Sequence, residues 1–215
     1  MEDKFRWPRK GDDPFFVKSA NPCSPTWASL SWLEGMRIGD SSLALAFKEC
    51  GDKVVTELER GESIEHPDMY FIPIGYLYRH SLELKMKQVI RLALKLELLE
   101  KDQKIVDVLD GHALYPLWNY VKLGAQKLWP GDPGDELKIV EGVIQSLHQL
   151  DKSGQGLRYT KDSSGQSTLL NLPTSVDLSH FKDVFEGVFN LLDGCESAFE
   201  DTFQTMGDMW QDCGP

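Results

Sequence analysis

The stretch that decides the fold is Met69–Leu99, MYFIPIGYLYRHSLELKMKQVIRLALKLELL. It contains no proline or glycine after Gly75, so one long helix can continue to its end. At 3.6 residues per turn, its main apolar stripe consists of Phe71, Gly75, Tyr78, Leu82, Met86, Val89, Ala93 and Leu96. Further leucines fall on other sides of the same helix. A helix that is apolar on several sides is expected at the centre of a domain rather than on its surface.

This central segment also carries charges that need partners. Arg79, His80, Glu83, Lys87 and Arg91 fall together on a second face. Glu83 lies four residues from both Arg79 and Lys87, which is the spacing of ion pairs within a helix. Charges held away from water require such partners. Two interpretations stay open: a salt-bridged helix face, or a ligand site in which histidine acts as acid or base and arginine holds phosphate.

Four further segments show apolar residues at helical spacing around the central one. Together with the central helix, the expected ranges are 41–60, 70–99, 112–129, 135–151 and 178–206. Between the last two, GLRY and STLLNL flank DSSGQ, a pattern that is typical of a β-hairpin. The sequence therefore predicts an all-α, up-and-down helical bundle with a small β-hairpin insertion.

The expected domain organisation has three parts. Residues 1–39 are rich in proline, glycine and tryptophan, and their large aromatic side chains predict an N-terminal arm that packs on the body. Residues 40–207 form the single bundle domain, and residues 208–215 are expected to be a frayed tail.

Composition narrows the classes of function. The formal charge of −11 disfavours broad electrostatic binding to nucleic acid, although a local basic site stays possible. The four cysteines form no CxxC pair and no secretion signal precedes them, which indicates reduced thiols in a cytoplasmic protein. No run approaches the roughly 20 apolar residues of a membrane span, so no membrane association is expected.

Three further candidates lie outside the central helix. His112 opens the helix that follows, and Arg158 with Tyr159 places a cation beside an aromatic ring. The simplest interpretation of His112 is a lone histidine that packs near the start of a helix. The simplest interpretation of Arg158 and Tyr159 is a cation that stacks on an aromatic ring at the surface. His80 and Glu83 could offer a metal two ligands, but no second such pair occurs, so no metal and no cofactor are expected. The common kinase, dehydrogenase and hydrolase motifs are also missing.

At these residues the chain resembles stand-alone bacterial proteins of the HEPN superfamily. The resemblance lies in Tyr78–Lys87 (YRHSLELKMK), His112–Trp118 (HALYPLW) and Leu150–Tyr159 (LDKSGQGLRY), and it covers about residues 40–200. It implies an α-helical bundle, frequent homodimers, and roles in toxin–antitoxin, phage-defence and RNA-processing systems. Many members are metal-independent endoribonucleases. Their usual motif, Arg and then His after four to six residues on a late helix, is missing from the late helices here, so that catalytic assignment does not carry over.

The expected function follows from the resemblance. It is a HEPN-like helical protein of a phage-defence or toxin–antitoxin type system that binds RNA, a nucleotide or a protein partner encoded nearby, as a homodimer. Two alternatives stay open: a non-catalytic acidic scaffold that neutralises or assembles with a basic partner, and a metal-independent endoribonuclease with an atypical site. The candidate catalytic residues are Arg79, His80, Glu83 and His112, and the candidate binding residues are Lys87, Arg158 and Tyr159.

Overall fold

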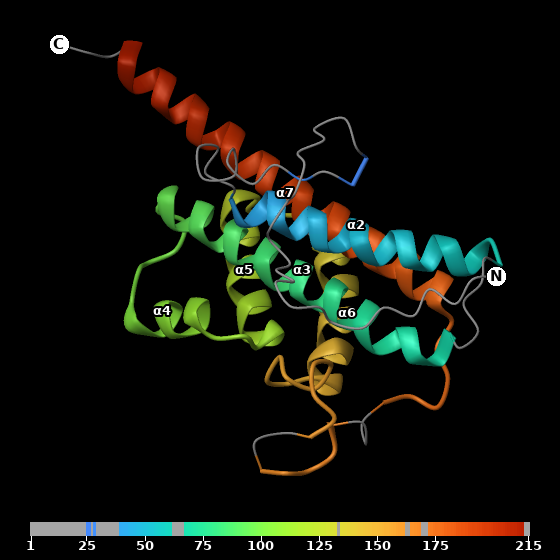
Figure 1. The fold of residues 1–215 in the computed structure, drawn as a ribbon. Helices are drawn as coiled ribbons and strands as arrows, with labels where there is room; N and C mark the ends of the chain where they lie inside the picture. Colours follow the sequence, from blue (N-terminus) through green and yellow to red (C-terminus); the bar gives the residue numbers. More distant parts are fainter. Residues whose placement is uncertain are drawn as a thin grey trace, which may run out of the picture. The chain divides into compact units, whose positions relative to one another are not determined.

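The computed structural model describes residues 25–26, 28, 39–61, 67–132, 134–161, 164–168 and 172–212. The chain divides into two units, Met1–Arg37 and Ile38–Pro215, and the fold described below is that of the second. The predicted N-terminal arm lies almost wholly outside the described residues. The described part of the second unit is helical and contains no strand (Figure 1).

Six helices follow one another along the described part of the chain. They are α2 (Asp40–Glu59), α3 (Pro67–Lys95), α4 (Gln103–Asp110), α5 (Leu114–Leu128), α6 (Asp135–Leu150) and α7 (Leu178–Asp212). The prediction of an all-α fold is thereby confirmed for the described residues. The central helix begins three residues earlier than expected, because Pro67 is well suited to a first helical position, where its missing N–H costs nothing.

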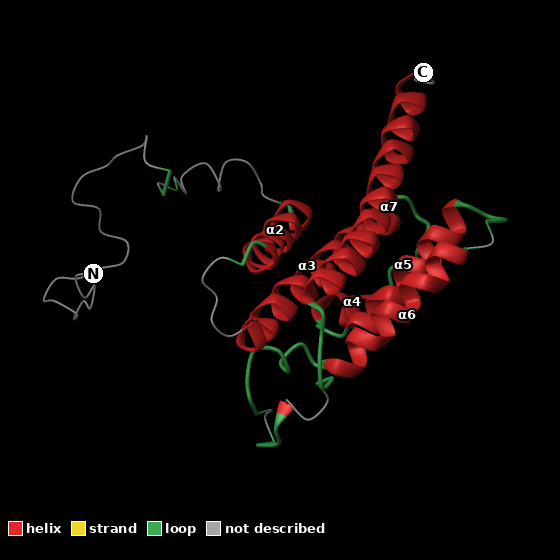
Figure 2. Cartoon of the chain, turned by 90° about the vertical axis from the view of Figure 1, so that its right-hand side faces the viewer, coloured by secondary structure: helices red, strands yellow, loops and turns green. Residues whose placement is uncertain are grey.

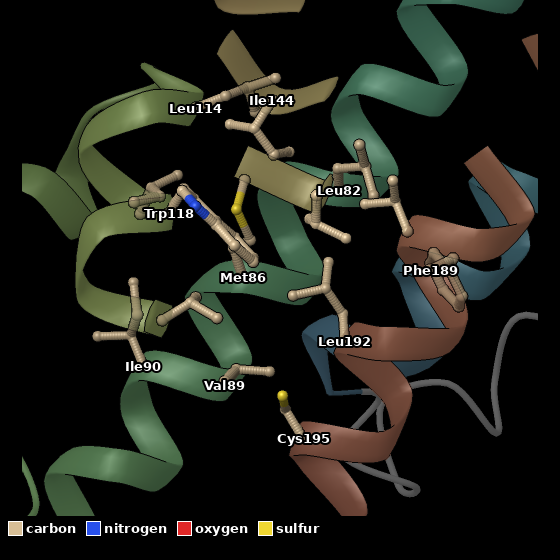
Figure 3. Packing of buried hydrophobic residues seen from close by; sticks show 14 of the residues in the cluster. Leu82, Met86, Val89, Ile90, Leu114, Trp118, Ile144, Phe189, Leu192 and Cys195 are labelled. Carbon is tan, nitrogen blue, oxygen red and sulfur yellow. The ribbon is translucent and has the colours of Figure 1, made fainter. Parts of the chain in front are cut away.

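Helix α3 is the central element, as its apolar pattern predicts. It packs against α2, α5 and α7 (Figure 2), and 14 of its 29 residues are buried. Leu82, Met86 and Val89 point from α3 into a core completed by Trp118 of α5 and Leu192 of α7 (Figure 3). Each large apolar side chain buried in this way contributes roughly 1.5–3 kcal/mol, so the core fixes α3 firmly.

The described residues do not form the predicted β-hairpin, and residues 169–171 of its second strand lie outside them. The residues of the expected first strand form a turn at 156–158, and Lys161 and Ser167 make an isolated antiparallel bridge. The physical reason is that the local N–H groups have nearby acceptors. The backbone N–H groups of Arg158 and Tyr159 both donate to the Gln155 carbonyl, at 3.0 and 3.1 Å. A segment whose N–H groups are satisfied locally does not need a neighbouring strand.

The helices differ from the predicted ranges at several ends, and α3 ends at Lys95 rather than at residue 99. Helix α4 lies outside the predicted ranges, and it begins where the Asp102 side chain caps it by accepting the Ile105 N–H at 2.9 Å. Helix α7 continues without a break through Gly194 and reaches Asp212. Among the described helices, none is both long enough and apolar enough to cross a membrane.

Candidate functional site

Arg79 is a buried arginine at the junction of three segments. Its Nη1 donates to Glu83 Oε2 at 3.1 Å, and its Nη2 donates to the His112 carbonyl at 2.5 Å. Its Nε lies 3.2 Å from Asp151 Oδ2, an ion pair without hydrogen-bond geometry. Only 2% of Arg79 is exposed. This residue therefore ties α3 to the segment before α5 and to the end of α6.

Glu83 is equally buried, and its carboxylate contacts two further side chains. Its Oε1 accepts from Lys87 Nζ at 3.0 Å and lies 2.8 Å from His112 Nδ1. Burial alone would raise the pKa of Glu83, but the hydrogen bonds from His112 and Lys87 and the charges of Lys87 and Arg79 outweigh it and lower that pKa. Glu83 is therefore ionised at neutral pH. We call Arg79, Glu83, Lys87, His112 and Asp151 the charge cluster.

Asp151, the cluster member that sequence reasoning missed, organises the loop after α6. Its Oδ1 accepts the N–H groups of Gly154 and Gly156 at 2.8 and 2.9 Å. Gly154 has φ of +78°, and a Cβ there would lie 3.0 Å from His112 Cβ and 3.1 Å from Arg79 Nη1. A signal did exist, because an aspartate just after a helix with glycines three and five positions later is typical of a side-chain-capped turn.

His112 is the exposed member of the charge cluster. Its side chain is 57% exposed, while its Nδ1 faces the buried Glu83 carboxylate. A carboxylate at one ring nitrogen fixes the tautomer and the orientation of an imidazole. When the ring is neutral, Nδ1 donates to Glu83, and Nε2, which has no partner among the described residues, is left as an acceptor. This is the arrangement of a histidine prepared for proton transfer or ligand binding.

A row of stacked side chains lies next to His112. The Arg158 Nε donates to the Gly154 carbonyl at 2.8 Å, which places Arg158 beside the glycine that contacts His112. The Arg158 guanidinium lies 5.8 Å from the ring centres of both Tyr76 and Tyr159. Tyr159 is 58% exposed. We call Tyr76, His80, Arg158 and Tyr159 the stacking surface.

His80 belongs to this surface rather than to the charge cluster. Its ring stacks on Tyr76 at 5.7 Å and meets the Phe47 ring edge-on at 4.6 Å. Burial lowers its pKa, the nearby charges of Arg79, Arg158 and Lys87 lower it further, and the charge of Glu83 opposes them. His80 is consequently neutral at pH 7 and packs as an aromatic side chain.

A second buried charge group lies on a different side of α3, and sequence reasoning missed it too. Lys85 is 2% exposed and forms ion pairs with Asp193 and Glu196 of α7. Ser41 of α2 accepts from Lys85 Nζ at 2.9 Å and donates to Glu196 Oε2 at 2.7 Å. We call these four residues the Lys85 group. It joins three helices and presents no exposed histidine.

The structure thus brings together most of the predicted site residues. Arg79, Glu83, Lys87 and His112 meet directly, and Arg158 and Tyr159 follow on the adjoining loop. No group of three or more His, Cys, Asp or Glu side chains in the described part of the chain is arranged to hold a metal ion. One Arg–His pair does have the nuclease spacing, Arg60 and His66, but it precedes the central helix and His66 lies outside the described residues.

No family model, curated protein or solved structure matches this chain.

Proposed function

We propose that this protein is a HEPN-like helical protein that binds RNA or a nucleotide at the surface formed by His112 and the stacking surface. The observation that supports it most is the Glu83–His112 contact of 2.8 Å, in which a buried carboxylate orients an exposed imidazole. Assignment to a phage-defence or toxin–antitoxin type system, and a homodimeric state, rest on the sequence resemblance and form part of the same proposal.

The chemistry of the surface fits a phosphate joined to a base. Arg158 and, when protonated, His112 offer positive donors for phosphate oxygens. The exposed Tyr159 ring offers a face on which a base can stack, a contact worth roughly 1–3 kcal/mol. The Arg158 guanidinium contacts two tyrosine rings and donates to the Gly154 carbonyl, so it is held in place before any ligand arrives.

The buried part of the cluster has a supporting role. Arg79 is 2% exposed and is held by hydrogen bonds to Glu83 and to the His112 carbonyl and by an ion pair with Asp151, so its guanidinium is not accessible to a phosphate. Glu83 and Arg79 together determine where His112 lies and which ring nitrogen it presents. We therefore assign ligand contact to His112, Arg158 and Tyr159, and positioning to Arg79, Glu83 and Lys87.

The net charge of −11 limits the length of nucleic acid that the protein can bind. A protein this acidic repels a long polyanion everywhere except at a local cationic site. We expect a short single-stranded segment or a mononucleotide to bind, through one or two phosphates. The logarithm of the association constant should then fall only shallowly with the logarithm of the salt concentration.

The experiment is a titration of fluorescein-labelled single-stranded RNA with the full-length protein in EDTA, followed by anisotropy, with AMP and UMP as competitors. Tyr159→Ala should weaken binding about tenfold or more, from the loss of one stacked base. Tyr70→Ala, which removes an exposed tyrosine elsewhere on α3, should leave it unchanged. No saturable binding of RNA or either nucleotide, or equal affinity of the two variants, would reject the proposal.

The endoribonuclease alternative is tested in the same mixtures. If His112 acts as acid or base, the RNA shortens in the presence of EDTA, and His112→Ala abolishes cleavage while His180→Ala, at an exposed histidine of α7, does not. Binding without cleavage assigns the protein a purely binding role.

A further inference from the structure

The C-terminal part of α7 combines acidity with an exposed apolar face. No Lys, Arg or His follows Lys182 in the sequence, whereas eight Asp and Glu residues do, so this segment contributes −8 of the total −11. The far end of α7 extends beyond the other described helices in both views (Figures 1 and 2). None of the other described helices therefore covers this end of α7.

An apolar stripe runs along this part of the helix. Cys195 and Phe199 are buried against the body, and Phe203 and Met206, one and two turns further, are 49% and 45% exposed. These positions recur at spacings of three and four residues and so share one face. The stripe begins inside the core and continues onto open surface without interruption.

The stripe starts at a pocket. A cavity of about 340 Å³ lies between α5, the α5–α6 turn and α7, where Trp129, Leu137, Leu191 and Cys195 form apolar walls. The Trp129 ring also packs near Phe199, at 6.2 Å between ring centres, so the pocket and the stripe are continuous. The cavity falls within the size range of sites that accept a ligand or a large anchoring side chain.

The charges around this surface are mainly negative. Asp132 and Glu136 line the pocket, and the exposed Glu200 lies beside the stripe. Asp201 and Asp208 follow on other sides of the same helix. Against them, the last turn of α5 supplies one lysine, Lys127. Charges within roughly 10 Å act together at moderate ionic strength, so a ligand here meets an anionic field.

We propose that the pocket and the α7 stripe bind a basic amphipathic helix of a partner protein. Its apolar residues, at helical spacing, would place one side chain in the pocket and others on Phe203 and Met206, while its Lys and Arg side chains would face Glu136 and Glu200. A second copy of this chain is the wrong occupant, because it would place the acidic Glu200 and Glu136 of one copy against those of the other, and like charges across an interface cost several kcal/mol. This proposal gives a defined surface to the basic partner of the scaffold alternative. It does not depend on the RNA-binding proposal.

The probe is a labelled peptide of about 18 residues, long enough for an amphipathic helix of five turns. Leucine recurs every three or four residues to form one apolar face, and lysine occupies the other positions. Anisotropy with the full-length protein should show saturable binding that weakens as salt increases. A peptide of the same composition in scrambled order should bind at least about tenfold more weakly, a difference of about 1.4 kcal/mol. Equal binding of the two peptides would reject the proposal, because charge alone would then explain it.

Two substitutions locate the surface. Phe203→Glu, at an exposed position that should not disturb folding, should weaken peptide binding about tenfold or more, and Glu200→Lys should weaken it at low salt. Ile139→Glu, at a 71% exposed site on α6 outside the pocket, is the matched control and should have no effect. His112→Ala should also bind the peptide normally, which separates this result from the RNA assay.

The same variants test the excluded occupant. Light scattering of the wild-type protein and of Phe203→Glu should give the same mass at equal concentration. A dimer of the wild type that Phe203→Glu converts to monomer would overturn the proposal, since α7 would then bind a second copy. Unchanged peptide affinity in Phe203→Glu would overturn it as well.

Discussion

The charge cluster and the Lys85 group are two solutions to the same problem on the same helix. Both compensate buried charges of α3 with ion pairs and hydrogen bonds. The Lys85 group recruits its partners from helices α2 and α7, and its Asp193 side chain is 55% exposed. The charge cluster has partners from two loops, His112 and Asp151, and only the histidine reaches the surface. The partners of the Lys85 group all lie on helices, which is the pattern of ion pairs that hold helices together. The charge cluster takes its partners from loops and presents one exposed imidazole, which is the pattern that our binding proposal requires.

The largest effect is expected from Glu83→Ala. This change leaves Arg79 and Lys87 buried without their shared carboxylate, and breaking a buried ion pair costs on the order of 3–5 kcal/mol. Chemical denaturation followed by circular dichroism should show that loss. A loss below about 1 kcal/mol, the range of exposed pairs, would mean that water reaches the cluster and that it does not hold α3 and the two loops together.

Lys85→Met should cost less than Glu83→Ala. Glu196 keeps its hydrogen bond from Ser41, and Asp193 turns to solvent, so the penalty is that of a weakened buried acceptor, about 1–3 kcal/mol. Measured in the same denaturation series, Lys85→Met should also leave RNA binding intact once folded. If Lys85→Met destabilised the protein more than Glu83→Ala, the ranking of the two groups would be wrong.

Gly154→Ala tests the contact between the Asp151 loop and His112. Its left-handed φ of +78° and the close approach of His112 and Arg79 make a side chain costly there, by about 1–3 kcal/mol. Gly165→Ala is the matched control, because φ is +82° but the space around it is open, so only the backbone penalty applies. Equal losses in the two variants would indicate that the loop does not pack on the cluster.

The pH dependence should separate Glu83 from His80. The pKa of Glu83 is lowered from 4.5, so its contribution is complete above that value and is lost as pH falls through the folded pKa. The pKa of His80 is lowered from 6.5, so its contribution is complete above pH 6.5 and is lost at mildly acidic pH. Half-buried His148, whose pKa is also lowered by burial, acts in the same direction.

His80→Gln should therefore flatten the stability profile just below pH 6.5 without removing the loss below pH 4.5. Glu83→Gln should remove the loss of stability below pH 4.5 and leave the decline just below pH 6.5 unchanged. Urea denaturation of both variants across this range provides the measurement. A steeper decline between pH 6.5 and 5 in His80→Gln than in wild type would contradict the assignment of His80 as a neutral, packed ring.

Local periodicity was sufficient to predict the central helix and the ion pairs within it. The apolar pattern of α3 identified the central helix, and the four-residue spacings identified the pairs of Glu83 with Arg79 and Lys87. Asp151 could not be found in this way, since it lies 72 residues from Arg79 and belongs to no periodic pattern. Lys85 escaped notice because it does not share the face of Arg79. The hairpin failed because GLRY alternates like a strand, while turn hydrogen bonds to Gln155 take up its N–H groups.

The central claim is that the buried Glu83 fixes the His112 ring so that Nε2 faces a ligand. A two-bond proton–nitrogen NMR spectrum of the histidine side chains at pH 8, recorded with and without AMP, tests it directly. The account predicts a proton on Nδ1 of His112, where it is donated to Glu83, and His112 resonances that shift on addition of AMP in wild type but not in Tyr159→Ala. A proton mainly on Nε2, or His112 resonances that AMP leaves unchanged, would contradict it.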